Sequence, residues 1–173
     1  MNTLTTKILL LIVPALILIN GSVAFSQTEN KPATQEKSSE HVIIKPSDIK
    51  WTDGPDFLPP GAKMAMLEGD ITKSGPFVVR VKLPAGYKIQ PHALKSKHSV
   101  TVLSGNVMLA MGDKFETKNE NTLPMGTFVI MPPKMNHFNW VNEEATIQVH
   151  GTGPLDVIYV NPQDDPRKAT GKK

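Results

Sequence analysis

The stretch "GYKIQPHALKSKHSVTVLSG", residues 86–105, carries two of the chain's five histidines between two glycines. In its second half, "HSVTVLS" (98–104), strand alternation places His98 on the same face as two valines. Because its neighbours on that face are β-branched and apolar, we expect His98 to point into the protein interior. His92 follows a turn rich in Gly and Pro, and can approach His98 across a hairpin.

Short β-type runs broken by Gly, Pro and Asn recur on both sides of this stretch. Their β-branched content and spacing are typical of an all-β sandwich or barrel. After residue 26, no window longer than about ten residues keeps a helical period. The polar stretch 111–126 is predicted to form a surface loop between strands. The predicted strands are 77–83, 98–104, 106–112, 127–131, 146–151 and 156–160.

Residues 1–26 are typical of a secretory signal peptide. Lys7 precedes the apolar run "ILLLIVPALILI", and the small residues Ala24 and Ser26 predict cleavage after Ser26. The run is short for a transmembrane span, and an uncleaved N-terminal anchor is the alternative. With no cysteine, the chain can carry neither a lipoprotein anchor nor a disulfide. We therefore predict export to the periplasm or an extracellular space, with no membrane attachment after cleavage.

The remaining residues divide into three segments. Residues 27–40 contain no aromatic or large aliphatic side chain and are predicted to be a disordered tether. Residues 41–165 are long enough to bury one core and are predicted to form a single β domain. Residues 166–173 are predicted to be a basic, frayed tail. The formal net charge of +3, to which Lys7 contributes, is too small to indicate a nucleic-acid partner.

A third histidine joins the first two in the predicted interior. His137 follows "PPKMN" at the start of another run. Imidazoles that converge from separate strands inside a barrel can bind a first-row transition metal. His92, His98 and His137 are therefore candidate metal ligands.

The first stretch resembles the first motif of cupins. That motif is Gly, five residues, His, one residue, His, three or four residues, Glu, six residues, Gly. The intervals fit, and the matching positions are Gly86, His92, Leu94, His98 and Gly105. Leucine thus stands where the family has its second histidine, and histidine stands at the glutamate position.

A second stretch resembles the second cupin motif, which is Gly, five residues, Pro, one residue, Gly, two residues, His, three residues, Asn. Three positions of "GTFVIMPPKMNHFNWV" match, namely Gly126, Pro132 and His137. Lys134 replaces the motif glycine, and Val141 replaces the motif asparagine.

The resemblance covers about residues 50–168 and is nearest to short single-domain cupins related to the cupin half of ChrR-type anti-sigma factors. It implies an all-β, antiparallel jelly-roll barrel with a metal pocket in one mouth, and it implies a homodimer. It implies four metal ligands, of which this chain can supply His92, His98 and His137. Three histidines are either a centre for zinc, iron, nickel or manganese with one open position, or the remnant of a site.

Four further residues are candidates for the pocket or for support of the metal ligands. Leu94 would make the pocket more apolar than in related proteins. For His150, the alternative is a partly exposed histidine ahead of a turn. The full set is Leu94, Trp140, Gln148 and His150.

Two small-molecule functions remain open from the sequence, beside a third possibility, a structural or partner-binding protein that dimerises through a sheet edge or face. One is a metal-dependent cupin that binds or transforms a small molecule. The other is a non-catalytic, metal-free module that binds or senses a small ligand, which Leu94 favours because ligand pockets are mostly apolar. Neither reading identifies the ligand, and whether the protein is an enzyme stays open.

Overall fold

The computed structural model describes residues 41–169. The predicted signal peptide (1–26) and tether (27–40) lie outside the described residues. Within residues 41–169, no helix is long and apolar enough to cross a membrane. The strands are β1 (Thr52–Asp53), β2 (Lys63–Glu68), β3 (Gly75–Leu83), β4 (Lys88–Leu94), β5 (His98–Ser104), β6 (Asn106–Met111), β7 (Asn121–Pro124), β8 (Phe128–Met131), β9 (His137–Trp140), β10 (Ala145–Gly153) and β11 (Val157–Tyr159).

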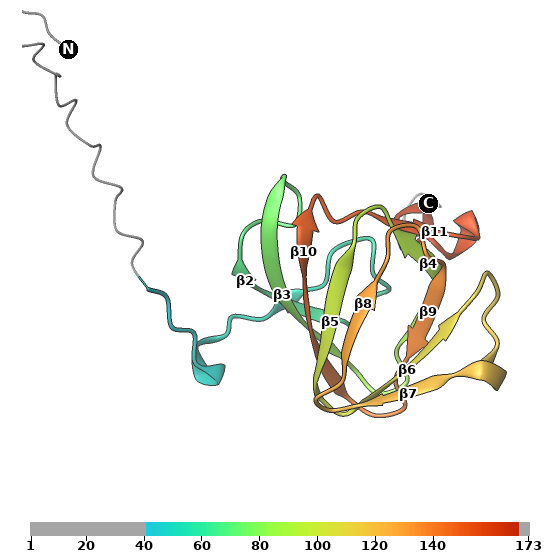
Figure 1. Ribbon diagram of the computed structural model, residues 1–173, viewed down its shortest axis with the longest axis horizontal. Helices are drawn as coiled ribbons and strands as arrows, with labels where there is room; N and C mark the ends of the chain where they lie inside the picture. The colour runs from blue at the N-terminus through green and yellow to red at the C-terminus, as the bar shows by residue number, and fades with distance from the viewer. Residues whose placement is uncertain (1–40, 170–173) are drawn as a thin grey trace, which may run out of the picture. The chain divides into compact units, whose positions relative to one another are not determined.

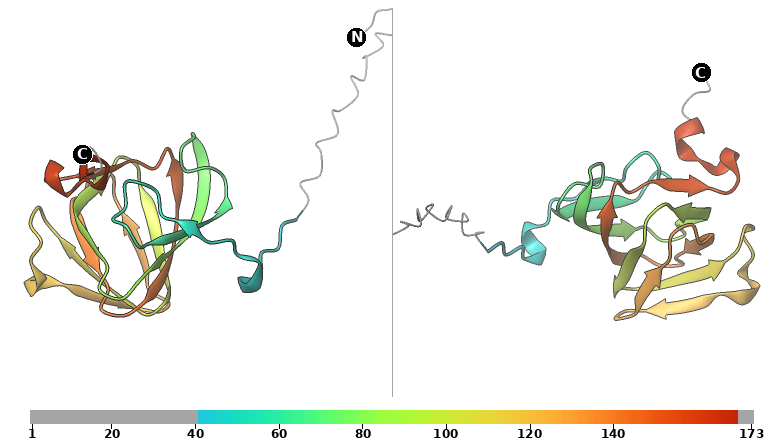
Figure 2. Two further views of the ribbon diagram at one scale, coloured as in Figure 1. Left: turned by 180° about the vertical axis from the view of Figure 1, so that it is seen from behind. Right: turned by 45° about the horizontal axis from the view of Figure 1, so that its top comes forward.

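The strands form two antiparallel sheets that face each other (Figure 1). The six-stranded sheet has the order β1-β2-β3-β10-β5-β8, and the five-stranded sheet has the order β11-β4-β9-β6-β7. Chain neighbours such as β4 and β5 lie in different sheets, so the chain crosses repeatedly between the layers (Figure 2). This arrangement is a jelly-roll barrel, and it confirms the predicted all-β fold.

The core lies between the sheets, where alternate residues of each strand meet. In β3, Phe77, Val79, Val81 and Leu83 are buried, while the residues between them are only partly covered. β3 pairs with the whole length of β10, whose Ile147 is also buried. Burial of each such side chain contributes about 1.5–3 kcal/mol. The β-branched runs of the sequence therefore form strands because one face of each is covered.

Three glycines of the two sequence motifs have backbone conformations that favour glycine. The φ angles of Gly86, Gly105 and Gly126 are 76°, 72° and 90°. At Gly105 a Cβ atom would lie 2.6 Å from the carbonyl oxygen of Glu144, so the turn also has no room for a side chain. The motif glycines thus mark the turns that connect the strands of the barrel.

Lys134 occupies the turn where the second motif has glycine. Its φ of 61° makes it the one non-glycine residue in the described part of the chain with positive φ. Its amide donates a hydrogen bond to the carbonyl of Leu94, at 2.8 Å. This hydrogen bond connects the turn before β9 to the end of β4. Glycine would adopt the same backbone conformation with less strain than lysine.

The predicted surface loop and tail contain more structure than the sequence indicated. The loop 111–126 includes a short 3-10 helix, η2 (Thr117–Asn119), and the edge strand β7. Another 3-10 helix, η1 (Pro46–Asp48), precedes β1, and the C-terminal side has a third, η3 (Pro162–Asp164), followed by a short helix, α1 (Pro166–Ala169). Arg167 in α1 bonds to the Asp165 carboxylate and to the carbonyl of Val157, which ties this segment to β11.

Candidate metal centre and ligand cavity

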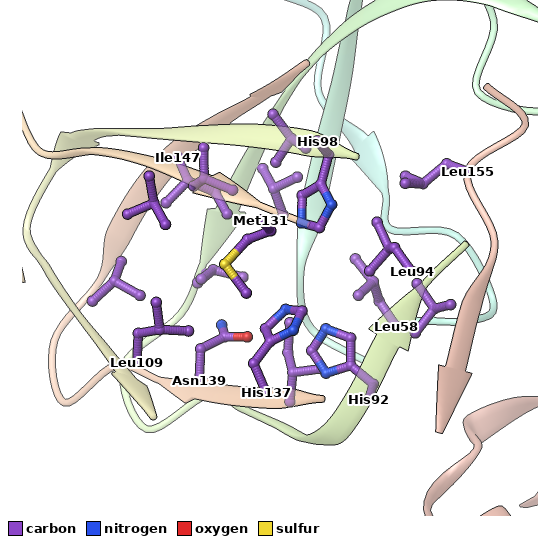
Figure 3. Close-up of a pocket in the computed structure, with 18 of the residues that line it drawn as sticks. Leu58, His92, Leu94, His98, Leu109, Met131, His137, Asn139, Ile147 and Leu155 are labelled. Carbon is purple, nitrogen blue, oxygen red and sulfur yellow. The ribbon is translucent and has the colours of Figure 1, made fainter. Parts of the chain in front are cut away.

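A cavity of about 120 Å³ lies between the two sheets, and His92, His98 and His137 all contribute to its wall (Figure 3). His92 and His137 lie opposite each other on β4 and β9 of the five-stranded sheet. His98 begins β5 in the six-stranded sheet. The fold thus brings together three histidines from three strands and both layers, as the sequence predicted.

His92 reaches the cavity because β4 contains a bulge. The register of β4 against β9 shifts between Ile89 and His92, where Pro91 provides no amide hydrogen for the ladder. Strict alternation from Ile89 would turn His92 away from the core. The bulge resets the alternation, so that Ile89, His92 and Leu94 all line the cavity.

The three rings lie close together but are not equally spaced. The ring centroids of His92 and His137 are 4.3 Å apart, and those of His98 and His137 are 6.0 Å apart. In residues 41–169, no three His, Asp or Glu side chains as placed could hold one metal ion. Two imidazoles with metal–nitrogen bonds of about 2.0–2.1 Å have centroids roughly 5 Å apart. His98 would therefore have to approach His137 by about 1 Å.

All three histidines use the same hydrogen bond to orient their rings. In each, Nδ1 faces the backbone carbonyl two residues earlier, at Gln90, Ser96 and Met135. The distances are 2.8 Å for His92, 3.5 Å for His98 and 2.9 Å for His137, so the bond of His98 is the weakest. A ring that donates its Nδ1 hydrogen to a carbonyl carries its lone pair on Nε2, which is how many metal-binding histidines are oriented.

Burial keeps these histidines neutral at pH 7. Each side chain is no more than 6% exposed. Desolvation first, and the neighbouring His137 second, lower the pKa of His92 to about 3 and that of His98 to about 4. Desolvation also lowers the pKa of His137. A neutral imidazole is the form that binds a metal, so the donor set is ready for one without loss of a proton.

The rest of the cavity wall is apolar apart from Asn139, which follows His137 by two residues on β9. Leu94 is 7% exposed and lines the cavity at the position that corresponds to the second histidine of the cupin motif. In Figure 3, Leu94, Leu58 and Leu155 lie on one side of the histidines, and Leu109, Ile147 and Asn139 lie on the other. The apolar lining is Phe57, Leu58, Met64, Val79, Val81, Leu83, Ile89, Leu94, Val100, Val107, Leu109, Leu123, Val129, Met131, Ile147, Val149, Leu155 and Val157.

The two tyrosines of the chain fix the loop that supplies part of this wall. The Tyr159 hydroxyl donates to the carbonyl of Phe57 at 2.9 Å, and the Tyr87 hydroxyl donates to the carbonyl of Pro59. Both tyrosines are buried, Tyr159 in β11 and Tyr87 directly before β4. Phe57 and Leu58 are thereby held against the cavity.

Three of the predicted pocket residues do not line the cavity. Gln148 and His150 alternate with Ile147 and Val149 on β10, and therefore lie on the outer face of the six-stranded sheet. Gln148 accepts a hydrogen bond from Arg80 there, and His150 stacks against Phe128 with centroids 6.0 Å apart. The prediction that they belong to the pocket is thus corrected by the strand alternation.

Trp140 is the third residue placed outside. It lies on the outer face of β9, because His137 and Asn139 occupy the inner face. Its ring packs against Phe115 of the surface loop, at 5.3 Å between centroids, in a small separate cluster with Phe138. Asn139, the polar residue that does face the cavity, was not predicted, although alternation from His137 indicates it.

The sequence and fold comparisons identify the family but no activity. The family model of a domain of unknown function, DUF4437, matches residues 17–158. No curated protein shows a significant match.

Solved structures with the same fold come from several bacteria. The polyketide cyclase RemF from Streptomyces resistomycificus is 15% identical with a TM-score of 0.62, over 77% of this chain and 94% of that one. An RmlC-like cupin from Ralstonia eutropha JMP134 is 14% identical with a TM-score of 0.55, over 73% and 76%. An RmlC-like cupin from Shewanella frigidimarina is 17% identical with a TM-score of 0.50, over 66% and 91%.

These similarities agree with the cupin fold, while the narrower resemblance to ChrR-type anti-sigma factors stays a prediction. The identities are low, so they establish architecture and not chemistry. The chain belongs to the DUF4437 family, and its fold is that of a cupin.

Proposed function

We propose that the protein is a small-molecule-binding cupin whose cavity holds one divalent transition metal on His92, His98 and His137. The observation that carries the proposal is the convergence of three buried, neutral imidazoles in a cavity that is otherwise almost wholly apolar. Each ring has its Nδ1 atom occupied by a backbone carbonyl. Their Nε2 atoms are therefore the available donors.

The three imidazole ligands favour some divalent metals over others. Zinc, iron and nickel suit imidazole ligands, whereas manganese prefers carboxylate and other oxygen ligands. None of the cavity-lining residues of the described chain is a carboxylate. We therefore expect zinc, iron or nickel in preference to manganese. A bound ion would supply Lewis acidity and an open position for water or ligand.

The residues around the three histidines would determine the surroundings of a ligand bound near the metal. Leu94 adds no donor, so the side of the histidines that it shares with Leu58 and Leu155 stays apolar. The aliphatic wall excludes water from the ligand and strengthens polar interactions inside the cavity. The Nδ1 hydrogen bonds would keep the three imidazole rings in the same orientation whether or not a small molecule occupies the cavity.

A metal-free binding module is the second candidate, and two observations favour it. Leu94 fills a ligand position with an aliphatic side chain, and the His98 ring lies 6.0 Å from His137, wider than a shared metal ion requires. In that case the apolar cavity alone would bind the ligand, and the histidines would serve as buried polar groups.

Metal analysis of the purified, untagged protein distinguishes the two. We expect about one equivalent of zinc, iron or nickel by mass spectrometry of the protein, and loss of that metal in His98→Ala. His150→Ala is the matched control and should retain the metal, because His150 lies on the outer face. Failure to bind any of these metals after reconstitution would overturn the metal centre and leave the binding module.

We also propose that the protein is exported, on the basis of the signal-peptide pattern in residues 1–26. Expression of the full chain in a bacterial host, followed by fractionation, should place it in the periplasm with Gln27 as its first residue. A cytoplasmic product that retains Met1 would contradict export.

A further inference from the structure

Asn139 is the polar group of the cavity that the metal proposal does not use. It lies on β9, opposite Ile89 of β4 and Leu109 of β6, both of which line the cavity. Figure 3 shows its amide on the Leu109 side of His137, away from Leu94 and Leu155. A ligand that extends inward past the histidines would therefore meet this side chain.

The Asn139 amide makes no hydrogen bond to any other residue in the described part of the chain. The side chain is half-buried, and its amide atoms stay accessible and are not sealed in the wall. The amide can therefore hydrogen-bond to a molecule in the cavity.

The rest of the wall limits what that partner can be. No Lys, Arg, Asp or Glu contributes to it among the described residues. A charged group on the ligand would be buried without a counter-charge, which is strongly unfavourable. The volume of about 120 Å³ is comparable to the engineered apolar cavity of about 150 Å³ that binds benzene.

We propose that the ligand is an uncharged, mainly apolar molecule about the size of one six-membered ring, with a hydroxyl or carbonyl group that hydrogen-bonds to Asn139. The amide can both donate and accept, so either group can satisfy it. The inference rests on the proposed use of the cavity for a small ligand, and it does not depend on the metal.

The test uses the metal-free full-length mature protein and four probes of similar shape, namely phenol, benzaldehyde, toluene and benzoate. Calorimetric titration should show phenol or benzaldehyde binding about 3- to 10-fold more tightly than toluene, the effect of one net hydrogen bond. Benzoate should bind more weakly than all three. Working without metal prevents coordination of the carboxylate from obscuring the result.

Asn139→Leu is nearly isosteric and should remove the preference while toluene still binds. Asn142→Leu is the matched control, because Asn142 is exposed outside the cavity and its variant should keep the preference. As a second measurement on the unmodified protein, the side-chain amide resonances of Asn139 should shift with phenol and not with toluene.

The outcomes separate this proposal from the proposed function. Equal affinity for toluene and phenol, or a preference that survives Asn139→Leu, would overturn the role of Asn139 and leave the cavity as a ligand site. Tight binding of benzoate would overturn the requirement for an uncharged ligand. Absence of binding by all four probes would overturn the cavity as a site for small ligands of this class, whatever the metal content.

Discussion

The two faces of β9 and β10 carry similar residue types with opposite roles. On the inner faces, His137 and Asn139 line the cavity beside the aliphatic residues of β10. On the outer faces, His150 stacks on Phe128 and Trp140 packs under the surface loop. One position along a strand therefore decides whether a histidine belongs to the candidate site.

The bulge in β4 shows that this alternation can be reset locally. Without the register shift between Ile89 and His92, the imidazole of His92 would leave the cavity. The site thus depends on strand alternation in β5 and β9 and on its interruption in β4.

The largest expected effect of the inner-face histidines is on how the free energy of unfolding depends on pH. In the metal-free protein, His92 and His98 stay neutral in the folded state down to pH 4 or below, while unfolded histidines bind protons below about pH 6.5. The free energy of unfolding that comes from keeping these two histidines neutral is fully present above pH 6.5. It is lost as the pH falls toward their folded pKa values. Between pH 6.5 and pH 5, each should lower the free energy of unfolding by about 2 kcal/mol.

Denaturant unfolding at the two pH values measures this effect. The double variant His92→Gln/His98→Gln should lose most of the pH dependence that the unmodified protein shows. Equal unfolding free energies of the metal-free protein at pH 6.5 and pH 5 would show that the cavity histidines accept protons freely.

The second largest effect is expected on metal affinity, when Leu94 is replaced by a histidine. Leu94→His would place a fourth imidazole in the cavity wall and complete a four-ligand set. We expect metal affinity to rise about 10- to 100-fold, the range that a single supporting group provides in metal sites. Competition with a chelator measures it, and Ile158→His on the exposed side of β11 is the control. An unchanged affinity would mean that position 94 does not face the metal.

A smaller effect is expected at the turn that leads into β9. Lys134→Gly should raise the free energy of unfolding by about 1 kcal/mol, because glycine adopts a φ of 61° with less strain. Lys118→Gly, an exposed lysine with ordinary φ, should not stabilise the protein. Thermal unfolding measures both, and a destabilised Lys134→Gly protein would indicate that the lysine side chain holds the turn.

The smallest effects are expected on the outer face of β10. His150→Ala and Gln148→Ala should each change the free energy of unfolding by less than about 1 kcal/mol, since both side chains lie outside the core. Neither should alter metal content. A loss of metal in either variant would contradict the assignment of this face.

The sequence predicted the parts of the fold that repeat a simple pattern. The β-branched runs gave β3, β5 and β10, and the spacing of the motifs brought three histidines into one cavity. The short strands β8 and β11 were also predicted, whereas β2 and β7 were not, because their own residues include few β-branched side chains. The bulge in β4 was not predicted either, since local alternation cannot show where a ladder skips a residue.

The errors at the site have a related cause. Alternation in β10 already set His150 and Gln148 opposite Ile147 and Val149, and the apolar side is the one that faces the core. Asn139 was not predicted because the motif asparagine corresponds to position 141, where this chain has valine. Strand alternation from His137 places Asn139 on the inner face and Trp140 on the outer face.

The proposed centre binds one metal through the Nε2 atoms of His92, His98 and His137. X-ray absorption spectroscopy of the protein reconstituted with zinc tests this most directly. We predict three imidazole nitrogens at about 2.0–2.1 Å, and loss of the bound zinc in His98→Ala. A spectrum with fewer than three imidazoles, or an unchanged spectrum of His98→Ala with zinc still bound, would place the metal elsewhere and contradict the proposed centre.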